Sequence, residues 1–347
     1  MSGPGPLAGL RILEVGHILA GPYATMLLAD LGARVTKVEP PGGDLSRQVS
    51  DAYFASLNRG KRSVRLDLAT PEGQERLHEL VRDADALLVN LKPSAVRRYG
   101  LAYEALRPWN ERLVCVALTG WGMDAGDEPA FDYVVQAATG IAALTGEPGG
   151  PPLLPGYSSA DNSAGLTAAL GLLAQVVSGR GGQIDVCLRD VMLSQLNYHA
   201  AAWLNDGKAP RRLGGAHAYY VPAQLFPTAD GHLALFITHD GFWRSFAAEA
   251  GVEGYATMAE RAARREEVIA AVTKALAADT AMRWEARLRP LGVPAAAVRT
   301  LPEALADTPE AVVEAGGHRL VGSPFRVAGY EPVYGPPPEL GEHGDHV

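Results

Sequence analysis

The sequence predicts an α/β fold built around a doubly wound parallel sheet. Three observations lead to this prediction. A strand, a helix and a second strand follow one another between Gly9 and Glu39, another helix and strand lie within residues 70–90, and a further helix and strand lie between Gly156 and Asp190. Because strands that alternate with helices usually form a parallel sheet covered by helices, the three regions together predict one layered domain.

The first region contains a strand at Leu10–Val15, a helix at Tyr23–Leu31 and a second strand at Ala33–Glu39 that ends in an acidic residue. This order resembles the start of a dinucleotide-binding domain. The turn at residues 16–22 lacks the Gly-x-Gly-x-x-Gly spacing that lets a backbone approach a pyrophosphate. The pattern therefore does not by itself indicate a nicotinamide site.

The second region continues the sheet. A helix is predicted over Pro71–Arg82, with proline in the favoured first turn after Thr70, and it leads into a short buried strand at Ala86–Asn90. Another buried strand is predicted at Leu113–Leu118.

Clusters of basic residues follow predicted strands at residues 56–63, 90–93 and 97–100. Charge runs of this kind are most often solvated surface. In an open α/β sheet, however, anionic ligands bind outside the carboxyl ends of the strands, which is where these clusters fall. Phosphate groups would fit them.

Asp161 stands at the start of the helix in the third region, which breaks at Gly179 and precedes a strand at Gln183–Leu188. One interpretation is that Asp161 serves only as the helix cap, because the carboxylate of an Asp at a helix start accepts backbone N–H bonds and is favoured by the helix dipole. The same position would keep the carboxylate deprotonated and available as a nucleophile. Both interpretations remain open. Its neighbours are small and leave room for a ligand: Ser158, Ser159, Ala160, Ser163, Ala164 and Gly165.

The rest of the chain predicts a smaller central domain and an extended tail. A long apolar helix is expected from Asp190 to about Trp203, a turn at Phe226–His232 joins two strands, and helices extend from Asp240 to Leu288. The tail from Ser323 is too rich in proline for a helix or strand, so it should lie extended over the surface or over a partner subunit.

The composition is that of a globular enzyme. The 347 residues are 47% hydrophobic and 20% charged, which predicts a large core and little disorder. A net charge of −8 argues against a nucleic-acid partner. Without a long apolar run or a signal-peptide pattern, we expect no membrane association and a cytoplasmic location. Cys115 and Cys187 lie in apolar strands, as buried thiols do, and no His, Cys and carboxylate cluster indicates a metal.

Several short motifs occur in order along nearly the whole chain. They are Ala20-Gly21-Pro22, Asn58-Arg59-Gly60-Lys61-Arg62-Ser63 with Leu66-Asp67-Leu68, Phe131-Asp132 with Gln136-Ala137, Thr145-Gly146, Asp161 with Gly165, Gly179-Arg180-Gly181 with Gln183, and Leu340-Gly341-Glu342-His343. Together they resemble the class III CoA-transferase family, which includes formyl-CoA transferase and carnitine CoA-transferase and is related to the α-methylacyl-CoA racemases.

This resemblance implies a Rossmann-like large domain built from both chain ends, a smaller α+β domain, and two subunits threaded through one another as an interlocked homodimer. Residues 1–200 would form the N-terminal part of the large CoA-binding domain and residues 215–295 the small domain. Residues 300–347 would return to the large domain and the partner subunit. Coenzyme A would be substrate and product, exchanged between an acyl-CoA and a small carboxylic acid, with no metal.

By position, Asp161 matches the family's nucleophilic aspartate. Gly214 and Gly215 fall where transferases carry a glycine-rich loop that shields the reacting acid from water. Lys61 and Arg98 would hold the CoA phosphates. The full set of matches to CoA contacts is His17, Ile18, Ala20, Lys61, Leu68, Asn90 and Arg98, with Gly214 and Gly215 in the loop.

The resemblance predicts CoA transfer through a covalent intermediate on Asp161. Three alternatives remain. An α-methylacyl-CoA racemase needs a base on each face of the α-carbon, and Phe131, itself a possible core aromatic, stands where that branch carries a histidine. A nicotinamide oxidoreductase would lack its glycine fingerprint. A non-catalytic CoA-binding protein would be favoured if Asp161 were inaccessible.

Overall fold

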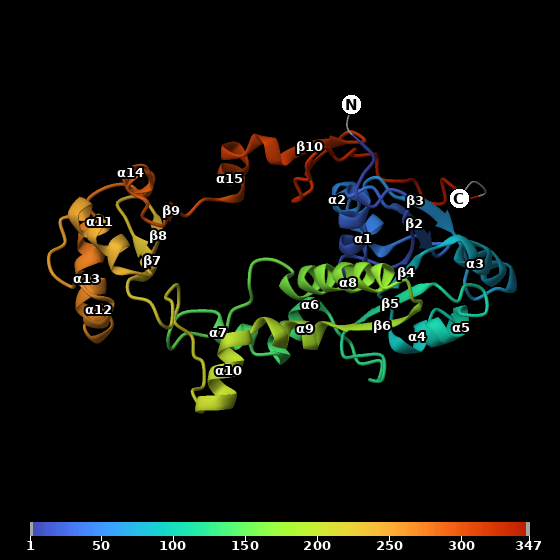
Figure 1. Cartoon of the computed structure of the whole chain (residues 1–347), viewed down its shortest axis with the longest axis horizontal. Coiled ribbons are helices and arrows are strands. Elements are labelled where there is room, and N and C mark those ends of the chain that lie inside the picture. Colours follow the sequence, from blue (N-terminus) through green and yellow to red (C-terminus); the bar gives the residue numbers. More distant parts are fainter. Residues whose placement is uncertain (1–2, 345–347) are drawn as a thin grey trace. The chain divides into compact units, whose positions relative to one another are not determined.

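The computed structural model describes residues 3–344, which form two compact units (Figure 1). Unit 1 holds the described residues up to Ala142, the segment Leu154–Ala209 and the described residues from Thr308 onward. Unit 2 holds Ala143–Leu153 and Pro210–Asp307. The chain therefore passes between the two units more than once.

A six-stranded parallel sheet forms the centre of unit 1, in the order β3-β2-β1-β4-β5-β6. The strands are β1 (Arg11–Val15), β2 (Arg34–Glu39), β3 (Arg62–Arg65), β4 (Ala86–Val89), β5 (Val114–Thr119) and β6 (Gly182–Cys187). This is the strand order of a doubly wound Rossmann-type sheet, so the predicted α/β class is confirmed. The order reverses between β1 and β4, and ligands of such sheets bind at the carboxyl ends around this point.

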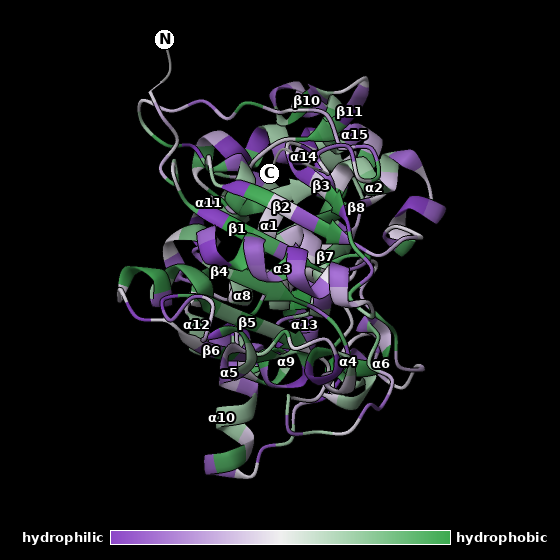
Figure 2. Ribbon diagram, turned by 90° about the vertical axis from the view of Figure 1, so that its right-hand side faces the viewer, coloured by the Kyte–Doolittle hydropathy of each residue, from purple (hydrophilic) through white to green (hydrophobic). Residues whose placement is uncertain are grey.

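Helices cover both faces of the sheet. Those of unit 1 are α1 (Ala20–Asp30), α2 (Asp51–Asn58), α3 (Pro71–Asp83), α4 (Pro93–Arg98), α5 (Tyr103–Leu106), α6 (Asp132–Ala138), α8 (Ser159–Val177), α9 (Leu188–Gln195) and α10 (Asn197–Asp206), with α7 (Ile141–Leu144) spanning the boundary in sequence. Ile12 and Leu88 pack in one apolar layer with α1 and α8, whereas Leu13 and Leu87 pack in the other with α3, α4 and α5. Alternate residues of one strand thus fill two cores, and Figure 2 shows β4, β5 and α8 as largely hydrophobic.

The predicted helix after Asp190 is wrong in one respect, because the chain forms α9 and α10 with a break at Leu196. At the break, the Asn197 side chain accepts a hydrogen bond from the Tyr198 amide, a local contact that competes with the helical ladder. The helix α10 buries none of its residues.

Unit 2 has a three-stranded antiparallel sheet in the order β7-β8-β9. Its elements are β7 (Ala223–Pro227), β8 (His232–Phe236), α11 (Asp240–Ala250), α12 (Met258–Ala263), α13 (Arg265–Leu276), α14 (Ala281–Leu288), β9 (Ala295–Ala297) and α15 (Leu301–Asp307). The predicted turn between two strands lies between β7 and β8. One sheet face packs on an apolar core that includes Phe226, Leu235 and Trp243.

The C-terminal part returns to unit 1. A hairpin of β10 (Val312–Ala315) and β11 (His318–Val321) is followed by a tail with no helix or strand up to residue 344. Pro336 O accepts a hydrogen bond from Gly60 N at 3.1 Å, and Gly341 N donates to Ser63 Oγ at 3.0 Å. As predicted, the proline-rich tail is extended, and here it lies on its own unit 1.

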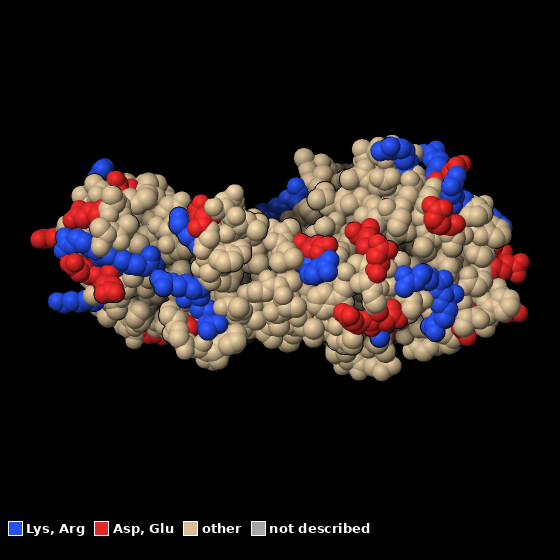
Figure 3. Space-filling view, turned by 90° about the horizontal axis from the view of Figure 1, so that it is seen from below, with Lys and Arg blue, Asp and Glu red and all other residues tan. Residues whose placement is uncertain are grey.

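Charged side chains of both signs are interspersed on the face of the chain in Figure 3, the usual pattern of a solvated surface. None of the helices formed by residues 3–344 is long and apolar enough to cross a membrane.

Candidate active site

A cavity of about 400 Å³ lies in unit 1 beyond the carboxyl ends of four strands. Ala20 lines it after β1, Asn90 after β4, Gly120 after β5 and Leu188 after β6, and Asp161 completes the wall. Three of the residues expected from sequence, Ala20, Asn90 and Asp161, thus come together from segments far apart in the chain. The cavity occupies the sheet edge where a doubly wound fold binds its ligands.

Asp161 is the third residue of α8, and a glycine one turn later fixes how closely this helix approaches its neighbour. A Cβ atom at Gly165 would lie 2.7 Å from the backbone oxygen of Ala20, so no larger residue fits without a shift of the backbone. The absence of a side chain at Gly165 therefore lets α8 pack against the start of α1.

The acid that caps α8 is Asp132, so the interpretation of Asp161 as the cap is wrong. One oxygen of Asp132 accepts hydrogen bonds from the backbone amides of Ala160 at 2.7 Å and Asp161 at 3.0 Å, and the other accepts one from Gln136 Nε2. No donor among residues 3–344 forms a hydrogen bond with the Asp161 carboxylate. The Asp161 carboxylate is therefore not used as a helix cap and can interact with a ligand.

Burial, and secondarily the charge of Asp132, raises the pKa of Asp161 to about 7. The expectation that the helix N-terminus keeps this carboxylate deprotonated is wrong in direction, because the dipole and the amides at this end are already compensated by Asp132. A carboxylate with this pKa is a stronger base and nucleophile than an ordinary one and is still about half ionised at neutral pH.

Asp161→Asn is expected to stabilise the protein at alkaline pH. Because the folded-state pKa of Asp161 is raised above its unfolded value, its contribution to stability is present below about pH 4 and is lost as the pH rises through about 7. Asparagine does not ionise, so the variant avoids this loss of stability. At alkaline pH its free energy of unfolding should exceed that of the wild type by up to about 4 kcal/mol. Melting temperatures of both proteins at about pH 5 and about pH 8.5 test this, and an advantage of the variant that did not grow with pH would contradict the raised pKa.

Two side chains hold the loop between β1 and α1. Asn90 accepts a hydrogen bond from His17 N at 2.8 Å and donates one to His17 O at 2.9 Å. Asp44 accepts one from Ile18 N at 3.0 Å. Ile18 has a φ of 65°, a conformation that costs a β-branched residue energy, so the two clamps maintain a strained loop beside the cavity.

His17 is half-buried, and burial is the main cause that lowers its pKa, so the imidazole is neutral at neutral pH. Its Nδ1 is buried, lies 4.0 Å from Asp44 Oδ1 and has no hydrogen-bond partner in the described part of the chain.

Lys61 is not at the surface but inside a buried network. Its Nζ contacts Glu14 Oε2 at 2.7 Å, Pro22 O at 2.9 Å and Asn58 Oδ1 at 3.0 Å. All three donors of the ammonium group are thus used within the protein, which leaves none for a phosphate. Burial lowers the pKa of Lys61 to about 8 in spite of Glu14.

The other expected contacts lie away from the cavity wall. Leu68 is half-buried against the α3 side of the sheet, and the exposed Arg98 donates to Tyr99 Oη at 2.8 Å. Lys92, from the cluster at residues 90–93, does line the cavity. The sequence analysis chose Arg98 and missed Lys92, which stands three residues after the last residue of β4; that position at a strand's carboxyl end was the signal that could have identified it.

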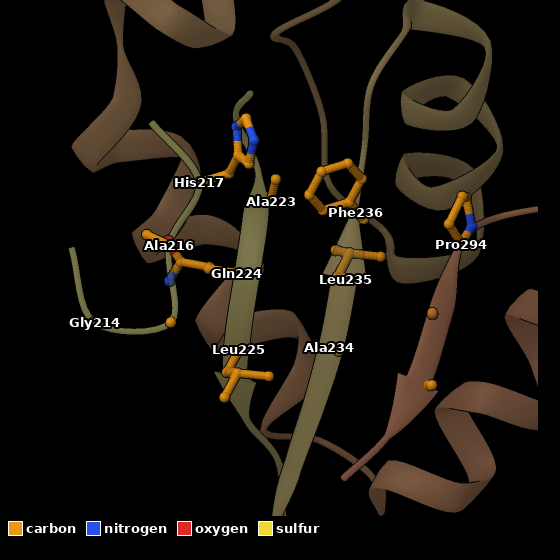
Figure 4. Close-up of a pocket in the computed structure, with 13 residues that line it drawn as sticks. Gly214, Ala216, His217, Ala223, Gln224, Leu225, Ala234, Leu235, Phe236 and Pro294 are labelled. Carbon is orange, nitrogen blue, oxygen red and sulfur yellow. The ribbon is translucent and has the colours of Figure 1, made fainter. Parts of the chain in front are cut away.

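Gly214 and Gly215 belong to unit 2, where they line a separate cavity of about 460 Å³ on the outer face of the β7-β8-β9 sheet (Figure 4). Figure 4 shows the loop beside Leu225, with Phe236 farther along the same face. A Cβ atom at Gly215 would lie 3.0 Å from Leu225 Cγ, so the loop lies close to the strand.

Phe131 is 67% exposed and lines the cavity together with Asp161, so its interpretation as a core aromatic is wrong. The prediction of buried thiols is confirmed, because Cys115 and Cys187 are both buried and neither forms a disulfide. No group of three or more His, Cys, Asp or Glu side chains in the described residues is arranged to hold a metal ion.

The comparisons with known proteins agree with this arrangement. Residues 7–344 match the family model of CoA-transferase family III. The chain is 36% identical to a succinate–glutarate CoA-transferase of Agrobacterium fabrum, over 87% of this chain and 82% of the relative. It is 34% identical to an acetyl-CoA:oxalate CoA-transferase of Acetobacter aceti, over 98% and 94%.

The crystal structure of a CaiB/BaiF family protein from Brucella suis superimposes on this chain with a TM-score of 0.87 and 32% identity, covering 99% of this chain and 98% of that one. The fold, the family model and the relatives all lead to the same conclusion. The chain belongs to CoA-transferase family III.

Proposed function

We propose that this family III enzyme moves CoA from an acyl-CoA thioester to a free carboxylic acid through a covalent intermediate on Asp161. The observation that carries the proposal is the state of that carboxylate. It lines the cavity at the sheet edge, its pKa is raised to about 7, and its hydrogen-bonding capacity is not used by the described residues.

In the first half of the reaction, the Asp161 carboxylate attacks the thioester carbonyl of the donor and expels CoA thiolate, which leaves an acyl-aspartyl anhydride. The thiolate then attacks the aspartyl carbonyl, so that the donor acid departs and Asp161 carries CoA as a thioester. The acceptor carboxylate reverses both steps. It attacks the aspartyl thioester and expels CoA thiolate, which then attacks the acceptor carbonyl and regenerates the Asp161 carboxylate.

The clamped loop at His17, Ile18 and Ala20, with Asn90, supplies the proposed contacts to CoA, because it borders the cavity and its backbone is held in place. Lys92, and Arg98 farther along, supply the positive charge for the phosphates. We leave Lys61 out of this set because its donors are occupied. Leu68 is kept in the set only as an apolar neighbour of CoA. Gly214 and Gly215 are kept as the loop that excludes water and donates hydrogen bonds to oxyanions.

Short dicarboxylic acids are the proposed substrate class. The two relatives described above are named for succinate, glutarate and oxalate, which all carry two carboxyl groups. Transfer assays with acyl-CoA donors of these acids and panels of free acids, read by mass spectrometry, test the activity. Absence of transfer to every acid would contradict the proposal.

A racemase remains the second candidate because its family is related. Phe131, the residue beside Asp132 at the cavity wall, cannot accept or donate a proton, which supports the transferase. The same assays run in heavy water separate the two, since rapid deuterium uptake at the α-carbon of a 2-methylacyl-CoA would favour the racemase.

We further propose that two copies form the interlocked homodimer expected from the family. The outer face of α8 exposes Leu166, Leu170 and Val177, and α10 exposes Trp203 and Leu204. An apolar surface of this extent is unusual for a soluble monomer, which supports a second copy as its cover.

An interlocked dimer should persist on dilution, because separating threaded chains requires unfolding. Sedimentation velocity across a wide range of protein concentrations measures this. A folded monomer at low concentration would exclude threading.

A further inference from the structure

We propose that Asp44 is a positioning residue, which holds the loop at residues 16–18 in the conformation that binds CoA. The assignment rests on the function proposed above and concerns a side chain outside the cavity. Asp44 follows β2, whereas the loop follows β1. Because β1 and β2 are adjacent parallel strands, their carboxyl ends bring these two segments of unit 1 together.

The Asp44 carboxylate is fully buried, and both of its oxygens have close contacts. Oδ1 accepts hydrogen bonds from Ser46 N at 2.8 Å and Ile18 N at 3.0 Å, and Oδ2 lies 2.7 Å from Lys37 Nζ. Burial disfavours the charged form, but Lys37 and the two amides outweigh burial and hold the pKa of Asp44 well below its ordinary value. A charged carboxylate therefore binds the loop, and hydrogen bonds to a charged group are the stronger kind.

Each of the three loop residues has a backbone hydrogen bond to a side chain from elsewhere in unit 1. The partners are Lys37 for Gly16 O at 3.0 Å, Asn90 for His17 N and O, and Asp44 for Ile18 N. Two of these partners, Lys37 and Asp44, are themselves an ion pair. The loop needs this support, because the φ of 65° at Ile18 is unfavourable for a β-branched residue.

Asp44 also holds a second part of the cavity wall. Its side chain caps the short 3₁₀ helix at residues 45–48. The first residue of that helix, Leu45, is 51% exposed and lines the cavity together with Ala20 and Asp161. One buried acid thus joins the loop that leads to Ala20 and the turn that carries Leu45.

The expected consequence is an effect on binding and not on chemistry. When the hydrogen bond to Ile18 N weakens, part of the population returns to a negative φ at this residue. The apparent Kd for CoA then rises in inverse proportion to the fraction that keeps the binding conformation. Asp161 itself is unchanged, so the KM for an acyl-CoA should rise while kcat stays the same.

The test compares Asp44→Asn with Asp30→Asn. The control makes the same substitution at another buried acid of unit 1, which pairs with Arg59 at 2.6 Å and lies outside the cavity wall. CoA is titrated by calorimetry, and KM and kcat are measured with one acyl-CoA donor, well below the melting temperature of each variant. We expect Asp44→Asn to raise Kd and KM about tenfold with kcat within about twofold, and Asp30→Asn to leave all three unchanged. An unchanged Kd in Asp44→Asn, or an equal rise in both variants, would overturn the proposal.

A double-mutant cycle with Ile18→Gly tests whether Asp44 acts through Ile18. Glycine adopts a φ of 65° without strain, so the loop no longer depends on the carboxylate. In the Ile18→Gly background, Asp44→Asn should therefore change the Kd for CoA by less than about threefold. The same factor in both backgrounds would show that Asp44 does not act through this residue.

If Asp44→Asn alone does not fold, the double variant Lys37→Met/Asp44→Asn is used in its place. It removes both members of an ion pair and leaves Glu14 paired with Lys61 at 2.7 Å, so no buried charge is left uncompensated. Its Kd for CoA should also rise about tenfold, and a wild-type Kd would contradict the proposal. Wild-type enzyme that bound CoA but transferred it to no acid would contradict the proposed function, and the calorimetric comparison would still decide the role of Asp44.

Discussion

Asp161→Asn is expected to lower the rate of CoA transfer by several orders of magnitude while the fold and CoA binding persist. The amide is a far weaker nucleophile than the carboxylate, so neither the anhydride nor the enzyme thioester can form. The fold should survive because Asp132, and not Asp161, satisfies the N-terminal amides of α8. Steady-state kinetics and direct titration with CoA separate lost chemistry from lost binding.

Asp190→Asn is the matched control for this variant. It makes the same substitution in the first turn of a neighbouring helix, α9, at an exposed position outside the cavity. Its transfer rate should equal that of the wild type. Near-normal transfer by Asp161→Asn would show that another acid is the nucleophile.

Glu14→Gln is expected to lower the free energy of unfolding more than Asp161→Asn, Asp190→Asn or Glu267→Gln does. Glu14 is fully buried on β1, with Oε1 at 2.6 Å from Lys37 Nζ and Oε2 at 2.7 Å from Lys61 Nζ, and Lys37 also pairs with Asp44 at 2.7 Å. Two carboxylates and two ammonium groups thus balance one another. Removing one charge leaves a buried cation uncompensated, which costs about 3–5 kcal/mol.

Urea unfolding, with hydrogen exchange at the β1 and β2 amides, measures this loss in unit 1. Glu267→Gln is the control, because it breaks an exposed pair with Arg264 and should cost far less than the buried substitution. Similar losses in both variants would mean that the buried network does not stabilise unit 1.

Much of the fold could be predicted because its signals are local. Thr70 Oγ1 accepts from Gly73 N at 3.1 Å, as the sequence of a proline-started helix indicates, and the predicted strands at the first two βαβ positions match β1, β2 and β4 within a residue or two. Asp161 was found for a similar reason, since small neighbours and the family motif single it out.

The partners of the buried polar side chains could not be predicted from the sequence. Asp132 caps a helix that begins well beyond it in the chain, and Lys61 turns inward to Glu14 although its motif resembles a basic surface loop. One signal was available. Glu14 and Lys37 are opposite charges in the middle of two predicted strands, and they are register partners in adjacent β1 and β2, so an internal ion pair could have been expected.

The most direct test of the central claim is to trap the intermediate on the enzyme. Hydroxylamine added to wild-type enzyme during incubation with an acyl-CoA donor should convert the activated aspartyl group to a hydroxamate, because an anhydride or thioester reacts with this nucleophile and a free carboxylate does not. Peptide mass mapping should then locate the change on the peptide that contains Asp161, and Asp161→Asn should show none. An adduct on another acid such as Asp132, or no adduct under conditions of rapid transfer, would contradict the covalent role of Asp161.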